Sequence, residues 1–162
     1  MNRKIHTVDD AKRKLEHFCA YQERCHKEVT EKLRAMGMIP VAVDAVVVHL
    51  IENGFLNEER FARSFVRGKF RVKKWGKQRI VRELKFRDIS QSNIKLALEE
   101  IEDADYLRAF DELAAKKWLQ LRHSTPGNTA KDISRCRKKL ADYLLYRGWE
   151  SHLVYDRLYE LS

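Results

Sequence analysis

The chain has 162 residues, and 44% of them are hydrophobic, which is enough to bury a core and argues against disorder. Only two prolines and six glycines occur, against 35% charged residues, so helix breakers are scarce. The formal net charge of +9 favours partners that carry phosphate groups or acidic surfaces. Composition therefore predicts an all-α protein and argues against a sandwich of short strands.

Several classes of protein are excluded by the absence of their sequence signals. The basic N-terminus is not followed by an apolar run, so we expect no secretory signal and a cytoplasmic location. The longest apolar stretch, 41–51, is interrupted by polar residues and is far below the ~20 residues of a membrane span. The three cysteines, Cys19, Cys25 and Cys136, match no disulfide or zinc spacing and are expected to be buried thiols. No phosphate loop or catalytic motif occurs, so we expect neither an enzyme nor a metal or cofactor site.

The first unit, residues 1–54, is predicted to contain three helices. Thr7, followed three residues later by Asp10, can cap the first helix. Pro40 suits the first turn of the third helix, where a missing amide hydrogen has no consequence. The inner face of the first helix is predicted to include Val8, Leu15, Phe18 and Cys19. The predicted helices cover residues 8–24, 26–36 and 40–54.

The second and third units, residues 55–102 and 103–162, repeat this pattern. Asn57 and Ser90 are acceptors at the expected starts of two helices, and a helix over 78–87 lies between them. The third unit opens with a long helix, continues through a loop insertion near 123–129, and ends with two further helices. The predicted inward residues of the long helix are Leu107, Phe110, Leu113, Ala114 and Trp118.

One turn sequence recurs in all three units. The copies are Leu33-x-x-Met36-Gly37-Met38, Leu84-x-x-Arg87-Asp88-Ile89 and Leu144-x-x-Arg147-Gly148-Trp149. An aliphatic residue precedes each copy by four positions, so the same helix face is apolar each time. Tandem repeats of this kind stack on their neighbours. The sequence therefore predicts three tandem three-helix repeats in an elongated, curved arrangement.

The second unit carries the positive charge of the chain. From Arg63 to Arg82 there are nine Lys or Arg residues and no Asp or Glu, so the remainder of the chain sums to neutral. We call residues 63–82 the basic segment. Such a segment is typical of a surface that binds phosphate or an acidic protein groove. The candidate binding residues are Arg63, Arg67, Lys69, Arg71, Lys73, Lys74, Trp75, Lys77, Arg79 and Arg82.

Other interpretations of these residues stay open. The cations could form a solvated face, although nine like charges without an acid repel one another. Trp75 could pack in the core or stack on a base. A helix-turn-helix protein that reads bases with Gln78, Arg79 and Arg82 is the alternative function. The acidic cluster in 99–105 would repel a phosphate backbone and suits a protein surface better.

The segment GFLNEERFA at 54–62, followed by the basic helix and by Trp75-Gly76-x-x-Arg79-Ile80-x-x-Glu83-Leu84, resembles the signature of the RecX regulatory proteins. The turns of the first and last units resemble that family as well. The resemblance implies a monomer that binds the recombinase RecA, in its filament on single- or double-stranded DNA, and represses its recombinase, ATPase and coprotease activities. It places the protein in DNA recombination, DNA repair and the SOS response. The middle turn has Asp88 where the family usually has Gly.

Overall fold

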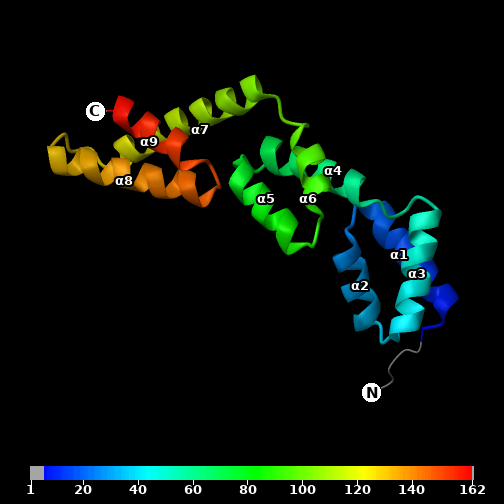
Figure 1. Cartoon of the computed structure of the whole chain (residues 1–162). Coiled ribbons are helices and arrows are strands. Elements are labelled where there is room, and N and C mark those ends of the chain that lie inside the picture. Colours follow the sequence, from blue (N-terminus) through cyan, green and yellow to red (C-terminus); the bar gives the residue numbers. More distant parts are fainter. Residues whose placement is uncertain (1–5, 162) are drawn as a thin grey trace, which may run out of the picture. The chain divides into compact units, whose positions relative to one another are not determined.

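The computed structural model describes residues 6–161, and this part of the chain forms nine α-helices and no strand (Figure 1). The helices are α1 (Val8–Tyr21), α2 (His26–Ala35), α3 (Pro40–Glu52), α4 (Glu58–Arg71), α5 (Lys77–Phe86), α6 (Gln91–Leu98), α7 (Asp103–Ser124), α8 (Ala130–Tyr146) and α9 (Ser151–Glu160). The all-α prediction is confirmed. Part of the N-terminal sequence behind the prediction of no secretory signal, residues 1–5, lies outside the described residues. Within residues 6–161, no helix is long and apolar enough to cross a membrane.

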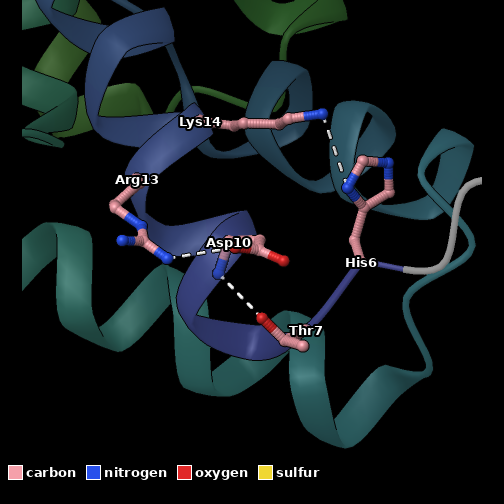
Figure 2. Close-up of polar contacts among 5 residues, drawn as sticks. All are labelled: His6, Thr7, Asp10, Arg13 and Lys14. Carbon is pink, nitrogen blue, oxygen red and sulfur yellow. Dashed lines mark hydrogen bonds and ion pairs between the residues drawn. The ribbon is translucent and has the colours of Figure 1, made fainter.

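Helices α1, α4 and α6 begin where a side-chain acceptor caps a free backbone amide. At the start of α1, the Asp10 amide donates to Thr7 Oγ1 at 3.1 Å, and Arg13 pairs with the Asp10 carboxylate at 3.0 Å (Figure 2). Asn57 Oδ1 accepts from the Arg60 amide at 2.9 Å, and Ser90 Oγ accepts from the Asn93 amide at 3.2 Å. The three starts predicted from Thr7, Asn57 and Ser90 are therefore confirmed.

The chain packs as two compact units, each with its own core. From here on, "first unit" and "second unit" mean these two compact units and not the three predicted repeats. Of the described residues, the first unit joins 6–65 with 84–97, and α3 packs against both α1 and α2. The second joins 66–83 with 98–161, and α8 packs against both α7 and α9. Helices α4 and α5 each contribute residues to both units. The division of the sequence into three repeats at 54 and 102 stays a prediction.

The three recurring turns have the same backbone geometry. The amides of Met38, Ile89 and Trp149 donate to the carbonyl oxygens of Leu33, Leu84 and Leu144 at 3.1, 3.1 and 3.2 Å. The residue before each of these donors has a positive φ: Gly37 at 80°, Asp88 at 58° and Gly148 at 91°. This combination is a Schellman C-cap, in which a left-handed residue ends the helix. The repeat read from the sequence thus corresponds to one turn, built three times.

Trp149 is the largest side chain of the second unit's core and is fully buried. Its ring centroid lies 4.6 Å from that of Tyr106 and 5.3 Å from that of Phe110. The centroids of Phe70 and Tyr106 are 5.9 Å apart, so α4 and α7 meet through aromatic rings. Such tilted pairs stabilise a core beyond their buried area.

The structure corrects two predicted core positions. Val8 is 36% exposed and Leu107 is 48% exposed. Val8 is the first residue of α1, ahead of the turn that packs. In α7 the buried stripe is Tyr106, Phe110 and Ala114, so Leu107 lies one position off the inward face. The predicted thiols are confirmed as free and buried at all three cysteines.

Candidate partner-binding surface

The ten candidate residues do not all belong to one compact unit. Arg63 is in the first unit, where its Nε pairs with Glu59 one turn earlier on α4 at 3.2 Å. The other nine candidates are in the second unit, on the last turns of α4, on α5 and in the turn between these helices. The candidate surface is therefore described from the second unit.

Two of these cations are held by the acidic cluster that follows α6. Arg67 pairs with Glu100 at 3.2 Å, and Lys77 pairs with Asp103 at 3.7 Å. The Lys77 ammonium also lies 4.5 Å from the ring centroid of Tyr106. The acidic cluster, which the sequence suggested as a protein contact, is thus partly engaged inside its own unit. Both pairs remain partly solvated, so each contributes little to stability.

Four other cations are exposed. Their side chains form no ion pair or hydrogen bond within residues 6–161, and they are Arg71, Lys73, Lys74 and Arg82. Lys74 has a φ of 57°, an unusual conformation for a residue with a side chain. Because no carboxylate neutralises them, these four positions are available to phosphate groups.

A stack of cationic and aromatic groups lies beside these four residues in the sequence. The guanidinium carbon of Arg79 is 4.1 Å from the Trp75 ring centroid and 4.8 Å from that of Tyr146. Lys69 Nζ lies 4.9 Å from the Trp75 ring. Trp75 is partly exposed and Tyr146 is 73% exposed. The arrangement combines positive charge with ring surfaces, as in proteins that bind single-stranded nucleic acids.

The turn that carries Lys73 and Lys74 is fixed by the turn that follows α8. The Gly76 amide donates to the Arg147 carbonyl oxygen at 2.8 Å, and the Gln78 amide donates to the Gly148 carbonyl oxygen at 3.1 Å. The indole Nε1 of Trp149 donates to the Lys74 carbonyl oxygen at 3.2 Å. The Arg147 guanidinium donates to the carbonyl oxygen of Lys73. These bonds hold the backbone of the turn while its two lysine side chains stay exposed.

A buried tyrosine supports the start of α5. The Tyr106 hydroxyl accepts from the Lys77 amide at 2.8 Å and donates to the Glu150 carboxylate, whose oxygens are 2.7 and 2.9 Å away. Burial is the main cause that raises the pKa of Tyr106 well above its usual range, so it stays a hydroxyl and keeps donating. Glu150 lies at the start of α9. The hydroxyl therefore links three helices of the second unit.

Tyr143, Tyr146 and Arg147, at the end of α8, were not among the candidates. The Tyr143 ring has Lys117 Nζ at 4.6 Å and the Arg147 guanidinium carbon at 4.8 Å. Their signal is the sequence YLLYRGW at 143–149, which the repeat alignment treated only as a helix end. Because the comparison of the three turns used apolar positions, it did not select the partly exposed Tyr143 or the exposed Tyr146.

Fold and surface together define the class of this protein. It is an all-helical protein of tandem three-helix repeats, with exposed cations and aromatic rings in the second of its two compact units. A family model described as "RecX, second three-helix domain" matches residues 57–98. The crystal structure of RecX from Lactobacillus salivarius is similar in fold, with a TM-score of 0.75 and 21% identity over 95% of this chain and 96% of that one.

Curated relatives extend the similarity over most of the sequence. The regulatory protein RecX of Pseudomonas fluorescens is 30% identical over 93% of this chain and 90% of its own length. That of Lactobacillus gasseri is 32% identical over 65% of this chain, and the match spans only 45% of the longer Lactobacillus protein. The chain belongs to the RecX family of regulatory proteins.

Proposed function

We propose that this protein binds the filament that the recombinase RecA forms on DNA, and that it represses the recombinase, ATPase and coprotease activities of RecA. The role is regulatory, not catalytic, and is carried out in the cytoplasm by a monomer. Membership of the RecX family supports this proposal, because the relatives are named regulatory proteins. The basic segment supplies the contact with the DNA of the filament.

The observation that carries the DNA contact is the set of four exposed cations that have no ion pair or hydrogen bond within residues 6–161 and lie close in the sequence to Trp75 and Arg79. If Arg71, Lys73, Lys74 and Arg82 neutralise about four phosphates, log affinity for single-stranded DNA falls with log salt at a slope of about −2.8. The rings add contacts that tolerate any base. Affinity should therefore depend strongly on salt and little on sequence.

The test is a titration of DNA-dependent RecA ATPase with wild-type protein and a charge variant. The variant Arg71→Gln/Lys73→Gln/Arg82→Gln removes three exposed cations without touching an ion pair. Arg67 is left intact because its replacement would leave Glu100 without this partner. Lys74 is left intact because its positive φ would add a backbone effect to the loss of charge. We expect the wild type to inhibit and the variant to inhibit much less.

A matched control removes the same charge from elsewhere in the second unit. Lys116, Lys138 and Lys139 are exposed on α7 and α8, with no ion pair or hydrogen bond within residues 6–161. Their triple replacement by Gln should leave inhibition close to that of the wild type. If both triple variants lose inhibition equally, net charge matters and the basic segment does not. If the wild type fails to inhibit, the proposal itself is wrong.

The alternative function, a helix-turn-helix protein that reads bases, rests on Gln78, Arg79 and Arg82 at the start of α5. Arg79 is stacked between Trp75 and Tyr146, and its guanidinium donates to the Tyr146 carbonyl oxygen at 3.4 Å. An arginine engaged in this way is poorly placed to read a base edge. A strong preference for one duplex sequence in the binding assay would favour this alternative.

A further inference from the structure

Helix α3 of the first unit has an apolar face that no other described residue of this unit, within 6–65 and 84–97, covers. Nine of its thirteen residues are Val, Ala, Leu or Ile, so apolar residues occur on more than one side of this helix. One side packs against α1 and α2 through Val43, Val46 and Leu50, which are at most 5% exposed. The opposite side is open, with Val41 at 77% exposed, Val48 at 50% and Ile51 at 44%.

The open side also carries negative charge. At 100° per residue, Asp44 and Glu52 lie on the same side of α3 as the exposed Val41 and Val48. Both carboxylates are exposed, and neither forms an ion pair or hydrogen bond within residues 6–161. The stretch 35–59 has four Asp or Glu residues and no Lys or Arg, in a chain with a net charge of +9. We call the exposed residues Ile39, Val41, Asp44, Val48, Ile51 and Glu52 the α3 face.

A small hollow adjoins the α3 face. Met38, Pro40, Val43 and Val47 contribute apolar groups to a pocket of about 350 Å³ between α2 and α3. Asp44 lines the same pocket, and Arg34 and His26 lie on its α2 wall. The pocket is large enough to receive one apolar side chain from a partner, next to a carboxylate.

We propose that the α3 face is a docking surface for a protein, namely one that presents an apolar patch bordered by Lys or Arg. Apolar side chains at 44–77% exposure favour burial against another apolar surface. Asp44 and Glu52 select a basic border by charge complementarity and repel phosphate, so nucleic acid and anionic membranes do not fit. A second copy does not fit either, because in a symmetric contact the α3 face would meet itself, and this face has no Lys or Arg to pair with Asp44 and Glu52.

The inference rests on the proposed function for the identity of the partner: the surface that docks on α3 belongs to RecA. It assigns different targets to different parts of the chain. The basic segment binds DNA, and the α3 face binds the recombinase. Two such contacts in one chain reinforce each other through effective concentration, which makes the filament a better target than bare DNA.

The test uses the full chain with the double variant Val41→Lys/Val48→Lys. Lysine is a better helix former than valine and both positions are exposed, so the helix is retained. Leu119→Lys is the control, since Leu119 is 70% exposed on α7 of the second unit. We expect the double variant to lose co-sedimentation with RecA filaments by about tenfold or more, as for loss of a central apolar contact. Its affinity for single-stranded DNA alone should match the wild type and the control.

The outcomes separate this inference from the proposed function. Undiminished filament binding by a folded double variant overturns the docking surface and leaves the proposed function intact. If the wild type does not bind filaments, the proposed function fails, and the surface is then tested with two synthetic helical peptides. One has a leucine stripe flanked by Lys, and the other has the same stripe flanked by Glu. Binding of the Lys peptide alone, lost in the double variant, supports the surface; any other pattern overturns it.

Self-association supplies a second measurement. Analytical ultracentrifugation of the wild type and the double variant compares their masses over a range of concentrations. We expect both to be monomers, since the α3 face carries carboxylates and has no Lys or Arg to pair with them in a second copy. A wild-type dimer that the double variant abolishes would mean that a second copy covers the face, and it would overturn the assignment to a basic partner.

Discussion

Gly76 and Gly148 meet backbone to backbone, although they lie in different turns of the second unit. A Cβ built on Gly76 would be 2.4 Å from both the carbonyl carbon and the carbonyl oxygen of Gly148. Two amides on the Gly76 side, those of Gly76 and Gln78, donate to the carbonyl oxygens of Arg147 and Gly148, and these bonds fix the turn with Lys73 and Lys74. Only glycine allows this approach at position 76, because any side chain would force the two turns apart.

Gly76→Ala should therefore destabilise the second unit by about 1–3 kcal/mol or more, through overpacking against rigid backbone. The control is Gly68→Ala in α4, where a Cβ would meet no atom within 4 Å. That variant should be more stable by about 0.5–1 kcal/mol, since alanine is the better helix former. Urea unfolding followed by tryptophan fluorescence measures both, because all three tryptophans belong to the second unit. Equal effects of the two variants would contradict the account.

The glycines show which features of the fold could be predicted from the sequence and which could not. Helix ends and repeat turns depend on local chemistry, so Thr7, Asn57 and the glycines at 37 and 148 were informative by themselves. The approach of Gly76 to Gly148 joins positions 72 residues apart, and no local pattern encodes it. The same holds for Arg67, a candidate binding residue that pairs with Glu100, 33 residues further along the chain. The basic segment was evident from the sequence, but which of its charges are unpaired was not.

Tyr106 was not among the predicted inward residues of α7, and the partners of its hydroxyl, Lys77 and Glu150, are 29 and 44 residues away in the sequence. Tyr106→Phe keeps the ring but leaves the Lys77 amide and the Glu150 carboxylate without their shared hydroxyl partner. We expect a loss of about 1–3 kcal/mol in the free energy of unfolding, as for an unsatisfied buried group. Affinity for single-stranded DNA should fall as well, because the start of α5 is loosened, while the salt slope stays the same. Fluorescence titrations with single-stranded DNA at several salt concentrations measure the affinity and its salt slope separately.

The control for that variant is Tyr155→Phe on α9. Tyr155 is 57% exposed, and its hydroxyl forms no hydrogen bond within residues 6–161, so its loss should change stability by less than about 0.5 kcal/mol. If Tyr106→Phe is as stable as Tyr155→Phe, the hydroxyl does not support the turn.

The capping box of α8 predicts a dependence of stability on pH. Asp132 accepts from Thr129 Oγ1 at 2.6 Å and from the Thr129 amide at 3.3 Å, and the side-chain bond is the main cause that lowers the pKa of Asp132. Since the folded pKa is below the unfolded value of about 3.9, this stabilisation is present above about pH 4 and is lost as pH falls through the folded pKa. Asp132→Asn should therefore unfold at a lower temperature than the wild type at pH 7. The difference between their unfolding temperatures should become smaller at acidic pH. A difference that grows at acidic pH would contradict the expected pH dependence.

Asp88 offers a test of the repeated turn itself, because it has a φ of 58° where the first and last turns have glycine. An L-residue in this region is strained by about 1–2 kcal/mol, and Asp tolerates it better than most. Asp88→Gly should thus stabilise the first unit by about 0.5–1 kcal/mol, and Asp88→Val should destabilise it by about 1–2 kcal/mol. Asp88→Asn removes the charge but keeps the tolerance, so it isolates any electrostatic effect on nearby Glu58, whose raised pKa arises mainly from burial and is raised further by Asp88. Thermal unfolding followed by circular dichroism ranks the variants. We expect stability to fall in the order Asp88→Gly, wild type, Asp88→Val. Any other order would mean that backbone conformation at position 88 does not determine the stability of the middle turn.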